Sequence, residues 1–236
     1  MSAPAPPTAP LPPAPDGALR VSLRTAAILL VFALAFTALM ALVHDLTHPV
    51  LQATAQEAKR RLIAEVLPAA AYDNDLLADV VALPPLPELG LTEPTRLHRA
   101  RRGGQPVALV FEAAAPDGYS GRIGLILAVR ADGRLAAVRV TQHRETPGLG
   151  DYIDPRKDRD KASPWIRQFD GRGFAATPRE QWRVRKDGGA FDQRAGATIS
   201  ARAVTHATAR ALAWALERQD RLYQLPAGAR YEEKTP

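Results

Sequence analysis

The feature that most constrains this chain is a run of 19 residues without a charged side chain, from Thr25 to Val43. As an α-helix rising 1.5 Å per residue, such a run covers about 28 Å, close to the roughly 30 Å of bilayer hydrocarbon. A buried core helix would have to be apolar all round, and a signal peptide usually has a shorter apolar stretch of about 7–15 residues. We therefore interpret residues 25–43 as an uncleaved, single-pass transmembrane helix.

The residues before the apolar run are rich in proline. Residues 3–15 contain seven of the 21 prolines in the chain. Because proline fixes φ and removes a backbone donor, neither a helix nor a central strand is expected there. A stiff polyproline segment can act as a recognition ligand, but an unstructured leader is the simpler interpretation. We predict a disordered, Pro-rich cytoplasmic tail over residues 1–24.

Charges beside the apolar run indicate its orientation. Arg20 and Arg24 precede the run, His44 and Asp45 follow it, and a basic triplet comes further on at 59–61. Basic residues close to a span favour the cytoplasmic side, so the nearest charges place the N-terminus inside. The expected location is the inner membrane of a bacterial cell, with the sequence after the span exported to the periplasm.

The exported sequence, residues 44–223, has the length of one domain, and we expect a C-terminal tail at 224–236. Apolar runs separated by Asp-Gly turns predict three antiparallel strands, at 106–114, 122–129 and 135–141. Helical patterns are found at 54–67, from Leu76, and at 200–223, with a connector at 83–87 and a loop-rich stretch from Thr146. The apolar face of the last helix carries Val204, Ala207, Ala211, Trp214 and Ala215. The predicted fold class is α+β, an antiparallel sheet packed by helices.

Composition and missing motifs exclude several classes of function. Lys and Arg number 31 against 25 Asp and Glu, but no basic run exceeds three residues, so nucleic acid is not an expected partner. The chain has no cysteine, which excludes disulfides, thiolate metal sites and cysteine nucleophiles. The five histidines lack zinc-site spacing, so we expect no metal site. The motifs of serine hydrolases, zinc proteases and nucleotide-binding loops are also missing, and we expect no catalytic residue.

The segment from Asp192 to Ser200 stands out because small residues place a hydroxyl at the start of a long helix. In one interpretation, Thr198 or Ser200 is an N-cap whose oxygen accepts from a free N–H of the first turn. In the other, the same free N–H groups and the positive end of the helix dipole hold a phosphate, and Gly196 and Ala197 let it approach the backbone. The residues alone leave both interpretations open.

The same segment resembles the flavinylation motif of the covalent FMN-binding domains. That motif has Asp, two variable residues, Ser or Thr, then Gly, Ala and a final Thr or Ser. Here Asp192, Gly196, Ala197 and Thr198 match it, while Ala195 replaces the usual hydroxyl residue. In that family a separate transferase esterifies FMN phosphate onto the last hydroxyl, so the resemblance implies covalent FMN on Thr198.

Further segments extend the resemblance over residues 20 to 223. They are the run from Tyr72 to Leu76, the run from Gly118 to Gly121, the run from His143 to Asp151, and Trp165-Ile166 with Phe169. Together with the anchor they resemble the G subunit of the Rnf ion-translocating electron transport complex. The C subunit of the sodium-translocating NADH:quinone reductase is a related family that shares the anchor and the motif.

The resemblance implies an electron-carrying flavoprotein subunit without independent turnover. Such a subunit works in a six-subunit complex that couples electron transfer between ferredoxin and NAD to ion translocation. Its partners are the other membrane and redox subunits, and a flavin transferase is needed for maturation. Two alternatives stay open: a C-type subunit of the quinone reductase, and a flavin-free, membrane-anchored scaffold domain.

The loop from Glu145 to Gly150 is the predicted neighbour of the flavin ring. Its Pro147-Gly148 pair is a turn signal, and Gly148 permits backbone conformations that other residues resist. A plain connecting loop is the alternative. If Thr198 carries FMN, Glu145 and Thr146 are the candidates for polar contacts to the ring. Trp165 is interpreted as a core aromatic residue rather than a stacking partner of the flavin.

Overall fold

The computed structural model describes residues 17–232, except for the side chains of residues 18–19 and 45–56. It divides into two compact units, one ending at Gln56 and the other beginning at Glu57. Helix α1 (Ala18–Val66) contains a segment, Arg20–His44, that is long and apolar enough to cross a membrane and is not buried by the described protein. The predicted apolar helix is thereby confirmed.

Helix α1 is longer than the sequence pattern suggests. The expected helices at 25–43 and 54–67 belong to this one helix. The intervening residues hold a single proline and no glycine, and one proline removes only one backbone donor. The helix also begins at Ala18, within the predicted tail 1–24, whose residues 1–16 lie outside the described residues.

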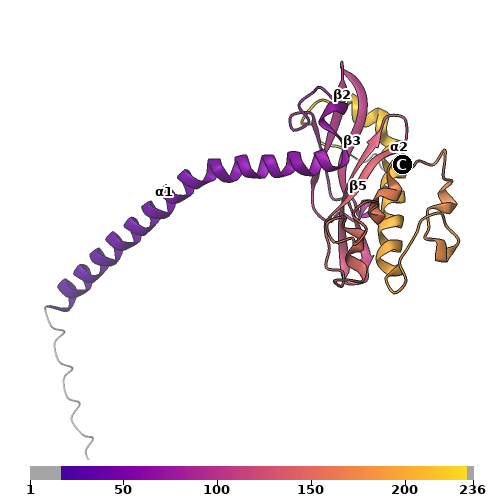
Figure 1. Ribbon diagram of the computed structural model, residues 1–236. Helices are drawn as coiled ribbons and strands as arrows, with labels where there is room; N and C mark the ends of the chain where they lie inside the picture. Colours follow the sequence, from indigo (N-terminus) through magenta and orange to yellow (C-terminus); the bar gives the residue numbers. More distant parts are fainter. Residues whose placement is uncertain (1–16, 233–236) are drawn as a thin grey trace, which may run out of the picture. The chain divides into compact units, whose positions relative to one another are not determined.

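The second unit is built on an antiparallel sheet whose five strands, within the described residues, follow chain order (Figure 1). They are β1 (Val80–Leu83), β2 (Thr95–Arg102), β3 (Gln105–Gly118), β4 (Gly121–Arg130) and β5 (Leu135–Gln142). The three predicted strands correspond to β3, β4 and β5 and are confirmed. The sequence did not reveal β1, which is only four residues long, or β2, which is rich in arginine.

Apolar side chains cover both faces of the sheet. Helix α2 (Thr198–Gln224) packs on one face, mainly against β3, and lies alongside the strands in Figure 1. All five residues predicted for its apolar face are buried. On the other face, small side chains pack against the last turn of α1, and this second cluster includes Ile63, Val66, Leu67, Ala100, Ala108, Val110, Ile126, Ala128 and Ala137. The predicted α+β architecture is confirmed.

Short 3-10 helices occupy much of the remaining chain. They are η1 (Ala69–Ala71), η2 (Pro87–Leu89), η3 (Gly150–Ile153), η4 (Trp165–Phe169), η5 (Arg179–Gln181) and η6 (Arg185–Asp187). The stretch between β5 and α2 has its own aromatic core, because Phe169 and Trp182 each pack against Phe191 at ring-centroid distances of 4.8 Å. The loop-rich stretch predicted from Thr146 is therefore a packed part of the domain.

The helix predicted from Leu76 is wrong. Residues 76–78 form a turn, and β1 begins at Val80. The Asp79 carboxylate accepts hydrogen bonds from Arg99 Nε at 2.7 Å and Arg101 Nε at 2.9 Å, and these bonds join this segment to β2. The long-range ion pairs outweigh the weak helical tendency of the few residues available.

Both edge strands of the sheet are hydrogen-bonded to segments outside it. Beside β1, the N–H of Gly228 donates to Val80 O at 2.7 Å and that of Tyr231 donates to Ala82 O at 2.8 Å. Beside β5, the N–H of Leu135 donates to Arg172 O at 2.7 Å.

The predicted C-terminal tail, 224–236, is therefore not free over its described part. Tyr231 is buried, with its ring edge-on to Trp214 at a centroid distance of 6.0 Å. The burial of this aromatic ring anchors the segment, and residues 233–236 lie outside the described residues.

His98 is a buried histidine on the face of the sheet that packs against α1. Its Nδ1 bonds to Leu76 O at 2.7 Å, while Nε2 has no hydrogen-bond partner in the described part of the chain. Burial is the main cause that lowers the pKa of His98, and Lys59 and Arg96 lower it further. Burial therefore favours the neutral form of His98 in the folded protein.

We expect the free energy of unfolding to fall as the pH decreases below about 6.5. The unfolded chain takes up a proton on His98 there, whereas the folded chain resists it until the lower folded-state pKa is reached. Above about pH 7 this contribution is constant. Denaturant unfolding of the detergent-solubilised protein between pH 5 and 7.5 measures the effect. His98→Gln should flatten the profile more than His206→Gln, because His206 is only partly buried; equal slopes in wild type and His98→Gln would contradict this prediction.

Candidate functional site

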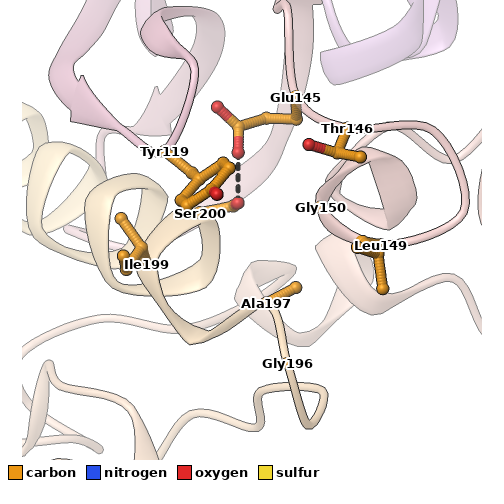
Figure 2. Close-up of a pocket in the computed structure, with 9 residues that line it drawn as sticks. All are labelled: Tyr119, Glu145, Thr146, Leu149, Gly150, Gly196, Ala197, Ile199 and Ser200. Carbon is orange, nitrogen blue, oxygen red and sulfur yellow. Dashed lines mark hydrogen bonds between the residues drawn. The ribbon is translucent and has the colours of Figure 1, made fainter.

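A pocket of about 220 Å³ lies at the N-terminal end of α2 (Figure 2). Three segments far apart in sequence form it: the β3–β4 turn, the loop after β5, and the start of α2. Its lining consists of Tyr119, Glu145, Thr146, Leu149, Gly150, Gly196, Ala197, Ile199 and Ser200. The fold thus brings the two segments that the sequence singled out, around residues 145 and 198, to one place.

Helix α2 begins without a side-chain cap. Its N-cap residue is Ala197, no side chain caps it in the described structure, and Thr198 is the first helical residue. The interpretation of Thr198 or Ser200 as an N-cap is therefore wrong. Because the first N–H groups of a helix have no partner within the helix, this end stays available to an anion.

Thr198 is flanked on both sides by residues that line the pocket. Its side chain is half-buried, and its hydroxyl forms no hydrogen bond within residues 17–232. Gly196, two residues before Thr198, has φ of +81°, a left-handed conformation that suits glycine. The hydroxyl is therefore not committed to any contact that maintains the fold.

Glu145 is a buried acidic residue of the pocket. Ser200 Oγ donates to its Oε2, as the dashed line in Figure 2 marks, and the N–H of Ser120 donates to Oε1 at 3.0 Å. These bonds join the β3–β4 turn to the first turn of α2. Gly150 has to be small here, because a Cβ would lie 2.6 Å from Ser200 Oγ and 2.9 Å from Glu145 Oε2.

The other predicted neighbours of the flavin ring take different places. Thr146 lines the pocket, but Gly148 does not. Gly148 forms the turn of the loop, with φ of +75° and its N–H donating to Asp151 Oδ1 at 2.9 Å. That turn brings Leu149 and Gly150 to the pocket instead.

Trp165 belongs to the core and is not among the residues that line the pocket. Its ring is edge-on to Tyr152 at 5.4 Å and to Phe169 at 5.5 Å, and its Nε1 donates to Asp192 O at 2.6 Å. The structure thus agrees with the interpretation of Trp165 as a core aromatic residue.

Three large apolar side chains at the pocket were missed by sequence reasoning. Tyr119 is 67% exposed, Leu149 54% and Ile199 45%. They come from the three segments that form the pocket, and Figure 2 draws them around it. Only the tertiary arrangement identifies them, because each is a single apolar residue in an otherwise polar or small-residue stretch. We call these three residues the apolar rim.

Comparisons with known proteins agree with this geometry. A family model described as an FMN-binding domain matches residues 118–213, which include Thr198 and every residue that lines the pocket. A second, described as the RnfG N-terminal region, matches residues 19–66, nearly the whole of α1.

Curated relatives match over most of their length. A protein of Pseudomonas aeruginosa strain PAO1 is 43% identical over 218 residues, which cover 92% of this chain and 100% of the relative. Relatives from Shewanella loihica and Vibrio cholerae are 39% and 41% identical and cover 88% and 84% of this chain, and 96% and 92% of their own. Each is named as the G subunit of an ion-translocating oxidoreductase complex.

Proposed function

Because the chain belongs to the family of G subunits of ion-translocating oxidoreductase complexes, we propose that it is an electron-transfer subunit carrying FMN on Thr198. The observation that carries this proposal is the position of Thr198. Its uncommitted hydroxyl stands at the uncapped N-terminus of α2, beside a pocket that lies wholly within the FMN-binding region.

The residues around Thr198 suit a phosphoester. The free N–H groups and the positive dipole end of α2 favour a negative charge at this point. Gly196 lacks a side chain, and nothing lies within 4 Å of where its Cβ would be. A phosphate on Thr198 can therefore approach the backbone without steric conflict.

The pocket suits part of an isoalloxazine ring. The apolar rim would contact its flat aromatic surface, and Glu145 and Thr146 would supply polar contacts to its heteroatoms. Pockets that enclose a whole ligand usually measure about 300–1,000 Å³, whereas this one measures about 220 Å³. Part of the flavin would therefore remain at the protein surface, as the exchange of electrons with a partner requires.

Bound FMN supplies the redox chemistry, and the protein holds and tunes it. The buried Glu145 carboxylate places a polar, hydrogen-bonded group at the floor of the pocket. The apolar rim would cover part of the bound ring with nonpolar side chains. No side chain of the chain has to act as an acid or base for electron transfer, which is consistent with the missing catalytic motifs.

In the assembled complex, α1 anchors the subunit in the inner membrane and the domain lies in the periplasm. The other membrane and redox subunits of a six-subunit complex exchange electrons with the flavin and couple transfer between ferredoxin and NAD to ion translocation. The match of residues 19–66 to the RnfG N-terminal region favours this complex over the related quinone reductase.

The test is ultraviolet fluorescence of the protein on a denaturing gel after co-expression with a flavin transferase. We expect a fluorescent band, because a phosphoester survives denaturation and a non-covalent flavin does not. A dark band, with the transferase active on a control substrate, would overturn the proposal and favour a flavin-free scaffold domain.

A further inference from the structure

The residues just before Thr198 form a constrained loop. We call residues 192–197 the acceptor loop. It contains a turn in which the N–H of Ala197 donates to Arg194 O at 3.2 Å, with Gly196 in the left-handed conformation at φ of +81°. Ala195 and Gly196, at the tip of the turn, are exposed. The loop thus projects its tip to solvent directly beside the flavin-accepting hydroxyl.

A single hydroxyl group bridges the two ends of this turn. Tyr152 Oη accepts a hydrogen bond from the N–H of Arg194 at 3.2 Å and donates one to Ala197 O at 3.3 Å. Burial raises the pKa of Tyr152, so the phenol keeps the proton that it donates. Tyr152 therefore fixes both the start and the end of the turn, and Ala197 is the residue that precedes Thr198.

The Tyr152 ring is itself held on two sides. Its edge packs against Trp165, and the Arg194 guanidinium lies over its face at 4.7 Å from the centroid. That guanidinium pairs with Asp158, which is 0% exposed. Although burial acts to raise the pKa of Asp158, hydrogen bonds from backbone N–H groups and from Arg194 lower it, so the carboxylate stays charged.

The first residue of the acceptor loop is held in the same way. The N–H of Asp192 donates to Gln168 Oε1 at 2.7 Å, and Asp192 O accepts from Trp165 Nε1 at 2.6 Å. Side chains of η3 and η4 thus bind the loop backbone at three positions, Asp192, Arg194 and Ala197, while Ala195 and Gly196 at its tip are exposed.

We propose that Tyr152 is a positioning residue that presets the acceptor loop for covalent attachment of the flavin. This inference rests on the proposed function of Thr198. In the reaction, Thr198 Oγ1 bonds to the FMN phosphorus of flavin adenine dinucleotide, and the bond from that phosphorus to the AMP oxygen breaks. AMP leaves, and the hydroxyl proton passes to a base of the transferase or to solvent. Tyr152 touches none of the reacting atoms, because its hydroxyl acts on the loop backbone.

Loss of the Tyr152 hydroxyl should change the kinetics of flavin attachment in a specific way. Without the Tyr152 hydroxyl the loop samples other conformations, so only a fraction of molecules presents Thr198 correctly. The apparent affinity of the transferase for this protein falls in proportion to that fraction, whereas the turnover of correctly bound molecules is unchanged. We expect Tyr152→Phe to raise the KM of the transferase for the full-length protein about tenfold, with kcat changed less than about twofold.

The experiment uses the full-length protein in detergent, purified flavin transferase and flavin adenine dinucleotide, and follows in-gel flavin fluorescence against protein concentration. Tyr231→Phe is the matched control. Tyr231 is also buried, its hydroxyl accepts from Arg218 Nε at 3.1 Å, and Arg221 lies over its ring, but it packs against the far part of α2. A loss of folded protein would lower the final amount of labelled protein without raising KM.

A second variant keeps the inference testable if Tyr152→Phe does not fold. Gln168→Ala removes a half-buried surface side chain that holds Asp192, and should raise KM about threefold. Wild-type protein that takes up no flavin would contradict the proposed function of Thr198. A different result would overturn the positioning role alone. In that result the wild type takes up flavin, but Tyr152→Phe and Gln168→Ala have the same KM as Tyr231→Phe.

Discussion

Thr198→Ala is expected to abolish covalent flavin completely while leaving the domain folded. Residues 192–197 contain no other hydroxyl group, and the next one, on Ser200, is buried and donates to Glu145. The Thr198 hydroxyl has no hydrogen-bond partner in the described structure, and alanine is a better helix former. The free energy of unfolding should therefore change by less than about 0.5 kcal/mol.

In-gel fluorescence and the intact mass of the protein measure this outcome, and denaturant unfolding checks the fold. Thr198→Ser is the control, because it keeps a hydroxyl at the same position and should retain the flavin. A fluorescent band that persists in Thr198→Ala would assign the flavin to another residue.

Arg99→Met is expected to destabilise the domain by about 3 kcal/mol, a large part of the roughly 5–15 kcal/mol that stabilises a typical domain. Arg99 lies on β2 and is buried. Its Nη1 donates to Leu222 O at 2.9 Å and to Leu225 O, and its Nε donates to Asp79 at 2.7 Å. Methionine fills a similar space but leaves Leu222 O and Leu225 O without this donor and Asp79 without this partner.

Denaturant unfolding of the full-length protein measures this loss. Arg130→Met is the matched control, because Arg130 forms an exposed ion pair with Asp132 at 2.9 Å, and such pairs contribute about 0–1 kcal/mol. A change below about 1 kcal/mol in Arg99→Met would indicate that the end of α2 is held by other contacts.

Arg99 also explains what the sequence could and could not predict. The apolar span, the three strands joined by Asp-Gly turns, and α2 follow from local periodicity and turn chemistry, which the residues themselves carry. Strand β2 could not be predicted in this way, because the charged Arg99 is buried where an apolar residue would be expected. Its buried position depends on α2, more than 120 residues later in the chain.

The candidate site shows the same difference between local features, which the sequence can predict, and tertiary features, which it cannot. The motif around Thr198 is local, so its resemblance to the flavinylation motif was enough to predict the acceptor, and the Glu145 loop was predicted as its neighbour. The apolar rim and Tyr152 were not found, because a single exposed leucine or buried tyrosine is an ordinary feature until three distant segments are brought together. Gly148 looked like a pocket residue because a turn signal in the sequence does not tell which side of the turn faces the cavity.

The segments that pair with β1 and β5 have a consequence for how the subunit associates. An exposed strand edge is a template for pairing with another chain and thus for aggregation. Here Gly228 and Tyr231 are hydrogen-bonded along β1, and Arg172 is hydrogen-bonded to Leu135, the first residue of β5, so part of each edge is already paired within the chain. At these positions the edges of the sheet are therefore protected from pairing with a strand of another copy of the subunit.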